Sequence, residues 1–324
     1  MELNENADLD TSQVEDVRGA GGGLGGGGGG FGGFGGGGRG GFSGIPLPIG
    51  GGKIGLIITV VVVLGMLLGG GIFGSNLLGG SSGDQQTSST SLTEKCGTAN
   101  PNRFQDVDCR NLLYINSVQA YWQTALPQSF GVQYQKVTTR FFSNAIDTGC
   151  GQADSGVGPF YCPVDRHVYI DLTFYNELAD RFGAAGQFAQ PYVLAHEYGH
   201  HVQNLVGTMD QVHRQQQRDP SNANRISVRL ELQADCYAGV WTKHATETTS
   251  TGGQPLFKRI TQQDIQQALD AAAAVGDDAI QKRTSGRVDE SKFTHGTSAQ
   301  RQHWYSQGYT TGDPKSCDTF SNPA

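Results

Sequence analysis

The feature that most constrains this chain is a continuous apolar run, IGLIITVVVVLGMLLGGGIF, which extends from Ile54 to Phe73. The run carries no charge, and Thr59 is its most polar side chain. About 20 helical residues, each rising about 1.5 Å, cover the roughly 30 Å hydrocarbon core of a bilayer. A cleaved signal peptide would have a much shorter segment before its apolar run and a small-x-small cleavage site soon after it. The sequence therefore predicts a single transmembrane helix at residues 53–74.

The segments on either side of this run are poor in side chains that could form a core. An acidic, polar opening, MELNENADLDTSQVED, precedes a glycine tract, and Ser, Gly and Thr dominate residues 75–95. Packing cannot then offset the backbone entropy lost on ordering, about 1–2 kcal/mol per residue. We therefore expect a disordered Gly-rich tail over residues 1–52 and a flexible linker over residues 75–95.

The basic residues near the apolar run predict its orientation. Arg39 and Lys53 precede it, whereas no Lys or Arg follows it before Lys95. Because basic flanks stay in the cytoplasm, we expect the tail there and the C-terminal part outside. All six cysteines lie in that C-terminal part, beginning with Cys96, which agrees with an oxidising compartment. The prediction is a single-pass membrane protein with a cytoplasmic N-terminus and an extracytoplasmic domain.

Residues 96–324 have an ordinary composition and are numerous enough for one domain with a sizeable core. Residues 137–143 and 166–174 are expected to be strands. The second is either an edge that an extended peptide can pair with or an interior strand of the sheet. Helices are expected over 110–125, 188–205, 225–246, 261–283 and 298–307. Strands followed by helices favour an α+β fold. The net charge of −7 lacks the excess of positive charge that is typical of proteins that bind nucleic acid.

The most informative stretch is HEYGH at residues 196–200, an H-E-x-x-H motif. On a helix, His196 and His200 project side by side, so both imidazoles can bind one metal ion. Glu197 is placed to reach a metal-bound water without being a ligand. Gly199 costs about 1 kcal/mol relative to Ala in a helix, which favours close approach by another element beside the metal.

A second acidic pair, Glu231 and Asp235, lies in an apolar setting, LELQADCYAGVW. A catalytic zinc takes three protein ligands and keeps one position open for water, so Glu231 is the candidate third ligand. Asp235 is four residues further along the same helix face and can accept the remaining N–H of a ligand histidine. The alternative is a solvated helix face, which the apolar neighbours disfavour.

The motifs HEYGHHVQNL and ELQADCYAGVW resemble the neutral zinc metallopeptidase family of bacterial membrane proteins. The segments CGQADSGVGPFYCPVDRHVYIDLTF and HGTSAQRQHWYSQGYTTGDPKSCDTF are similar to other blocks of that family, so the resemblance covers residues 96–320. HExxH with a later ExxxD also resembles the gluzincin arrangement, which implies a zincin-like domain. The family resemblance implies that the protein is attached to a bacterial cell membrane. By position, the resemblance implies His196, His200 and Glu231 as zinc ligands and Glu197 as catalytic base. The polar stretch MDQVHRQQQRDPSNANR, before Glu231, looks like an insertion.

These residues predict one catalytic Zn²⁺ and a peptidase that acts on a peptide or protein substrate. Candidates for stabilising the oxyanion are His295, Tyr198 and Arg301. The alternative for His295 is a surface residue ahead of a helix capped by Thr297 or Ser298. Rival functions are a non-catalytic, zinc-containing binding or scaffold ectodomain and a zinc hydrolase acting on esters.

Six cysteines allow 15 disulfide connectivities. Proximity in the sequence favours Cys96–Cys109 and Cys150–Cys162, which leaves Cys236 and Cys317 as the third pair. Cys236 is five residues from Glu231, about 140° round a helix, so a disulfide suits it better than a place among the metal ligands.

Overall fold

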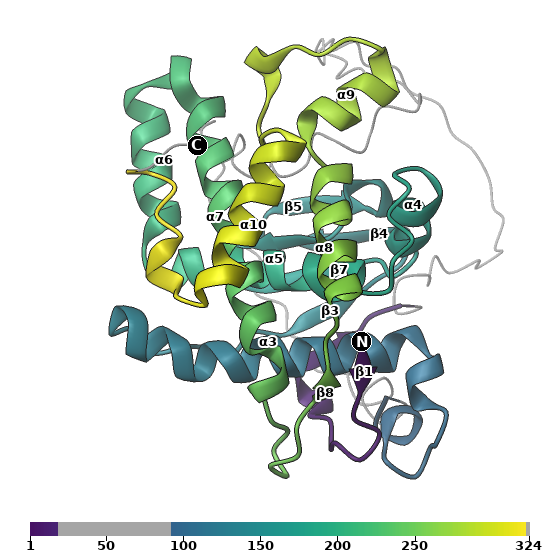
Figure 1. The fold of residues 1–324 in the computed structure, drawn as a ribbon. Helices are drawn as coiled ribbons and strands as arrows, with labels where there is room; N and C mark the ends of the chain where they lie inside the picture. Colours follow the sequence, from purple (N-terminus) through teal and green to yellow (C-terminus); the bar gives the residue numbers. More distant parts are fainter. Residues whose placement is uncertain (19–91, 322–324) are drawn as a thin grey trace, which may run out of the picture.

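The computed structural model describes residues 1–18 and 92–321, in which helices surround a small central sheet (Figure 1). The strand order in this sheet is β2-β3-β7-β6. The strands are β2 (Val14–Asp16), β3 (Thr139–Phe141), β7 (His167–Ile170) and β6 (Phe160–Cys162). The first three are parallel, and β6 is antiparallel to β7. The mixed helix-and-sheet architecture expected from the sequence is confirmed.

Strand β7 lies inside the sheet rather than at its edge. Val168 is opposite Thr139 of β3 on one side and opposite Tyr161 of β6 on the other. Of the two alternatives for this strand, the interior position is therefore the one observed, and β6 lies at the edge instead. The strand also ends earlier than expected, because Asp171 accepts hydrogen bonds from the backbone and hydroxyl of Thr173 and helix α4 (Phe174–Asp180) begins there.

Helices form where apolar spacing predicts them. They include α3 (Val107–Phe130), α5 (Ala189–Leu205), α7 (Ala223–His244) and α10 (Ser298–Thr311). The single helix expected over 261–283 is two helices, α8 (Gln262–Ala274) and α9 (Asp277–Ser285), because Gly276 adopts an extended conformation. The polar stretch interpreted as an insertion forms α6 (Thr208–Arg218), which packs against α7. The remaining strands are the hairpin β4 (Ala145–Thr148) and β5 (Gly151–Asp154), and β8 (Phe257–Arg259).

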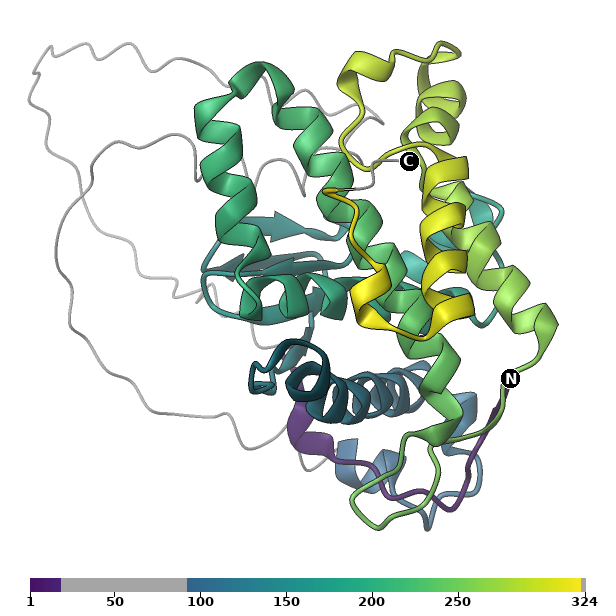
Figure 2. The ribbon, with the colours of Figure 1, turned by 60° about the vertical axis from the view of Figure 1, so that its left-hand side comes forward.

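Helices α7 and α10 lie in direct backbone contact (Figure 2). A Cβ added at Gly239 would collide with the carbonyl oxygen of Tyr305, and one added at Gly308 would collide with that of Cys236. Only glycine permits this separation, because any larger side chain would push the helices apart. The contact holds the C-terminal half of α10 against α7 directly after the second acidic pair.

Residues 1–18 are part of the fold, so the prediction of disorder from residue 1 is wrong for them. Strand β1 (Glu2–Leu3) pairs with β8, a 3₁₀ turn follows at Thr11–Gln13, and β2 extends the central sheet (Figure 1). The segment is polar, yet the domain supplies partners for it: Asn116 bonds both the N–H and the carbonyl of Asp10. The amino-acid composition of the segment alone cannot predict these tertiary contacts. Residues 19–52 lie outside the described residues.

The predicted linker, 75–95, is wrong at its C-terminal end for the same reason. Residues 92–96 form a helical turn, Leu92 is buried in the core, and Lys95 pairs with Asp108. Within residues 1–18 and 92–321, no helix is long and apolar enough to cross a bilayer. The predicted transmembrane helix at 53–74 and residues 75–91 lie outside the described part.

The three predicted disulfides are confirmed. The pairs are Cys96–Cys109, Cys150–Cys162 and Cys236–Cys317. The third fixes the C-terminal segment to α7, beside the residues considered next. Removal of a native disulfide from a small domain costs about 2–5 kcal/mol.

Candidate metal centre

Helix α5 brings His196 and His200 together as the H-E-x-x-H spacing predicts. Their ring centroids are 4.8 Å apart, and both residues are buried, as is Glu197 between them. The helix is apolar on the side that faces the core, where Leu194, Ala195 and Tyr198 are fully buried. Burial of the whole segment fixes the orientation of the two imidazoles.

Helix α7 supplies the predicted third ligand, Glu231. Its Oε2 is 3.1 Å from His196 Nε2, and its Oε1 is 3.5 Å from His200 Nε2. One donor atom from each of the three residues lies within 4.8 Å of the others. The close approach expected at Gly199 is present, because a Cβ there would lie 3.1 Å from the Cα of Ala234 in α7.

The donor set fits a zinc ion. His200 Nε2 and Glu197 Oε2 are buried atoms that have no hydrogen-bond partner in the described residues. Burying an unpaired polar atom costs about 1–3 kcal/mol, so such atoms in a native protein call for a missing partner. Two imidazole nitrogens and one carboxylate with an open position are the ligands of catalytic zinc.

Asp235 holds His196 in the orientation expected of it. Its Oδ1 is 2.9 Å from His196 Nδ1, which suits an Nδ1–H that donates to Asp235 and leaves Nε2 for a metal. Tyr192, one turn before His196, donates its hydroxyl to the same oxygen at 2.6 Å. Arg301 from α10 donates to both oxygens of Asp235.

Gln203 orients the other histidine, a role that the sequence analysis missed. Its Oε1 is 2.8 Å from His200 Nδ1, and its Nε2 donates to the carbonyl of Leu230 and to the side chain of Gln233. All three hydrogen bonds are buried. The signal in the sequence is the spacing of His200 and Gln203, which places them on one face of the helix.

Neighbouring charges decide the protonation of this cluster, because burial opposes every charge. Burial lowers the pKa of His196, but Asp235 and Glu231 outweigh it and raise the value to about 10. Burial raises the pKa of Asp235, but Arg301 and His196 bring it down to about 2. For Glu197 the burial wins, and its pKa is raised. A carboxyl with a raised pKa is suited to take up and release a proton.

A pocket of about 110 Å³ adjoins two of the three donors, His196 and Glu231. His196, Glu197 and Glu231 form one wall, and the other walls are largely apolar: Phe174, Phe182, Val193, Val275 and Ile280. The backbone of Tyr161 in β6 lies near enough to the Glu197 carboxyl to lower its pKa against the larger effect of burial, so the edge strand of the sheet borders the site.

His295 lines this pocket, as a role in stabilising the oxyanion requires. Its Nδ1 is 3.4 Å from Asp277 Oδ1, while Asp277 Oδ2 accepts the backbone N–H groups of Thr294, His295 and Gly296. Asp277 therefore fixes both the loop and the ring, a role absent from the sequence analysis. Thr297 caps α10, as also expected.

The other two oxyanion candidates are placed differently. Tyr198 points away from the donors, since its hydroxyl is hydrogen-bonded to Thr139 in the central sheet. Arg301 lines the pocket but uses its guanidinium on Asp235, Tyr192 and the carbonyl of Val275. Arg301 therefore acts on the site through Asp235.

Sequence comparisons agree with this centre. A family profile described as "Putative neutral zinc metallopeptidase" matches residues 5–320. The uncharacterized protein Rv2575 of Mycobacterium tuberculosis is 50% identical over 230 residues, which is 70% of this chain and 75% of that protein. The uncharacterized protein YpfJ of Escherichia coli K12 is 40% identical over 275 residues, 83% of this chain and 87% of that protein. No solved structure matches the chain. With its three metal donors in place and its profile match over nearly the whole length, the chain belongs to the "Putative neutral zinc metallopeptidase" family.

Proposed function

We propose that this protein is a zinc-dependent peptidase that hydrolyses peptide bonds. One observation carries the proposal: His196, His200 and Glu231 converge beside a buried Glu197 carboxyl whose Oε2 has no partner in the described residues. A purely structural zinc site is closed by four protein ligands and has no use for a base beside it.

The chemistry divides between the metal and the chain. Zinc held by His196, His200 and Glu231 would lower the pKa of a bound water to about 7 and polarise a carbonyl. Glu197 takes the proton of the attacking water and delivers it to the leaving amide nitrogen.

His295 is the group best placed to donate a hydrogen bond to the oxyanion. It shares the pocket with Glu197 and Glu231, and Asp277 orients its ring from the far side. A ring fixed in advance needs no rearrangement as charge develops on the substrate.

The substrate is proposed to be an extended peptide. In the described part of the chain, β6 has β7 on one side and no strand on the other, so its outer edge can pair with a peptide backbone. The pocket beside it is lined by apolar side chains, among them Phe182, Val193 and Ile280. We therefore expect a preference for a bulky apolar residue next to the cleaved bond. We also propose that the domain is zincin-like, and this proposal is supported by the sheet edge that lies above the helix carrying the metal donors.

The test uses the purified full chain, Glu197→Gln, and the exposed Glu290→Gln as control. Each protein is analysed for bound zinc and for cleavage of an unbiased peptide library. We expect one zinc in all three and cleavage about 10²–10⁴-fold slower in Glu197→Gln alone. Zinc with no cleavage by any protein would favour the non-catalytic binding ectodomain, and cleavage of esters only would favour the wider hydrolase. A chain without zinc would contradict the proposal.

Attachment to a bacterial cell membrane through the uncharged apolar run at residues 53–74 is part of the same proposal.

A further inference from the structure

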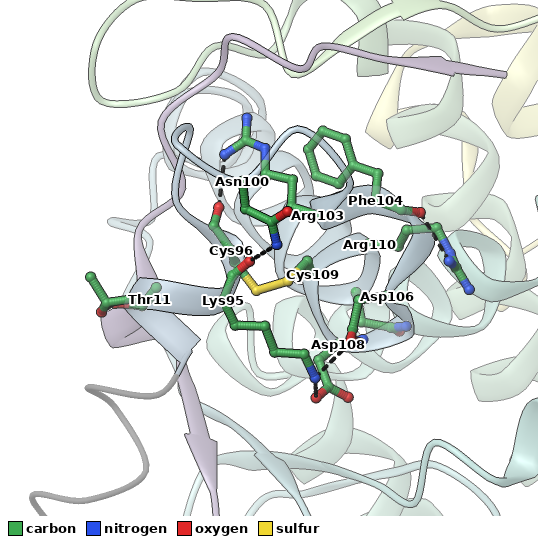
Figure 3. Close-up of a disulfide and its surroundings, with 12 residues drawn as sticks. Thr11, Lys95, Cys96, Asn100, Arg103, Phe104, Asp106, Asp108, Cys109 and Arg110 are labelled. Carbon is green, nitrogen blue, oxygen red and sulfur yellow. Dashed lines mark hydrogen bonds and ion pairs between the residues drawn. A yellow bond between two sulfur atoms is a disulfide. The ribbon is translucent and has the colours of Figure 1, made fainter.

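Two residues that bracket the apolar run bind the same carboxylate. Arg18 donates to Asp108 from both terminal nitrogens, at 3.0 and 2.9 Å, and Lys95 Nζ is 2.7 Å from Asp108 Oδ2. The Asp108 side chain is 7% exposed, so this contact is not a loose surface pair. Figure 3 shows Lys95 and Asp108 beside the Cys96–Cys109 disulfide. Arg18 and Lys95, 77 residues apart in the sequence, therefore lie at one place in the fold.

Arg103 makes the N-terminal residues an integral part of this place. Its side chain is buried, and one terminal nitrogen donates to the carbonyls of Glu5 and Ala7 at 2.8 and 2.7 Å. The other donates to the carbonyl of Cys96, as Figure 3 shows. Without residues 5–7, a buried guanidinium would lose acceptors that compensate for its desolvation, which is strongly unfavourable.

The sheet leads to the same conclusion. Strand β2 pairs in parallel with β3 over its whole length, and Gln119 of α3 bonds the side chain of Gln13. The family profile begins at residue 5, so this segment belongs to the region that the family shares. Residues 1–18 are thus a component of the domain rather than an appended tail.

We propose that residues 1–18 and 92–321 reside on the same, extracytoplasmic side of the membrane. A single crossing by residues 53–74 would place a hydrocarbon core of about 30 Å between them. Arg18 and Lys95 could not then both reach Asp108. The three disulfides assign the domain to an oxidising compartment, and the N-terminal segment goes with it. This topology replaces the one expected from Arg39 and Lys53, and it is independent of the peptidase function.

Protease accessibility in cells tests the topology. One epitope tag is inserted after Gly30 and another after Ala324 of the full chain, and spheroplasts are treated with protease before and after lysis. We expect both tags to be removed from intact spheroplasts. Removal of only one tag would overturn the proposal by showing a single crossing. Protection of both until lysis would overturn the extracytoplasmic assignment.

Thermal unfolding of the purified full chain tests the docking itself. Deletion of residues 2–18 is compared with deletion of residues 20–36, a stretch of equal length in the glycine tract. We expect Tm to fall by about 10 °C or more for the first and to stay unchanged for the second. Equal Tm values would overturn the proposal. If the first deletion does not fold, Arg18→Gln against Arg39→Gln gives the same comparison, with a fall of a few degrees expected for Arg18→Gln alone.

Discussion

Arg301 and Asp235 form a two-point contact: Nε of Arg301 donates to Oδ2 at 2.7 Å, and Nη2 donates to Oδ1 at 3.0 Å. Both side chains are buried, and Asp235 in turn bonds His196. The contact therefore transmits the position of α10 to the candidate metal ligand His196 on α5. It depends on the planar fork of the guanidinium, which an ammonium group lacks.

Replacement of Arg301 by Lys should therefore weaken zinc binding. One nitrogen cannot satisfy both oxygens of Asp235, so His196 loses part of its orientation. Loss of such a supporting group reduces metal affinity by about 10–100-fold. Competition against a chromophoric zinc chelator measures the change, with the exposed Arg287→Lys as control. An unchanged affinity in Arg301→Lys would contradict the role given to Arg301.

Gln203 should contribute as much to zinc affinity through His200 as Arg301 does through His196. In Gln203→Leu, His200 Nδ1 loses the acceptor at 2.8 Å and the ring is free to turn. We expect zinc affinity to fall by about 10–100-fold, while the exposed Gln211→Leu stays at the wild-type value. The same chelator competition applies, and circular dichroism shows whether each variant is folded. A folded Gln203→Leu that binds zinc normally would argue against this assignment.

His201 predicts a pH dependence of stability. Burial, the largest influence, lowers its pKa from 6.5 to about 4 despite the hydrogen bond to the carbonyl of Gln135. Between pH 4 and 6.5 the unfolded chain binds a proton at this residue and the folded chain does not. Stability therefore falls as pH falls through that range, by about 3 kcal/mol at most.

Denaturant unfolding at pH 4 and pH 7 measures the effect. The difference in unfolding free energy between wild type and His201→Gln should shrink at pH 4, because the variant lacks the titrating group. The exposed His303→Gln serves as the control for removal of an imidazole elsewhere in the chain. A constant difference for His201→Gln would show that His201 is not held neutral in the fold.

The pocket predicts a change in specificity. Val193 lines it from α5, so Val193→Phe should fill space that a bulky apolar substrate side chain occupies. We expect kcat/KM for peptides with such a residue to fall by about 10–200-fold relative to peptides with alanine there. Val288, a valine that is 48% exposed, provides the control Val288→Phe. An equal loss on both peptide types would indicate damage to the site rather than a smaller pocket.

The centre was largely predictable because helical periodicity fixes it locally. His196, Glu197 and His200 share one helix, and Glu231 and Asp235 share another, so spacing alone predicts which side chains face the same way. Two of the disulfides followed from proximity in the sequence, and Cys236–Cys317, 81 residues apart, was the pair that remained. His295 could be named as a candidate from its segment, but its place in the pocket depends on Asp277, which lies in a different element.

The residues that escaped prediction depend on long-range contacts. Residues 1–18 contain too little apolar surface to fold alone, and their order comes from partners such as Asn116 and Arg103. The inner position of β7 depends on β2, β3 and β6 all pairing in one sheet, which alternation within a single strand does not specify. The transmembrane prediction for 53–74 lies outside the described residues.

The pairing of β2 with β3 determines when the sheet can be completed during synthesis. Glu15 and Arg140 are joined by an ion pair but are 125 residues apart in the sequence. Strand β2 therefore cannot pair until the chain beyond residue 141 has been made, and such non-local contacts form slowly. Until β2 pairs with it, the edge of β3 is an open template on which strands of other nascent copies can assemble. A chain shortened at its N-terminus should accordingly aggregate during expression, before any loss of catalytic activity can be measured.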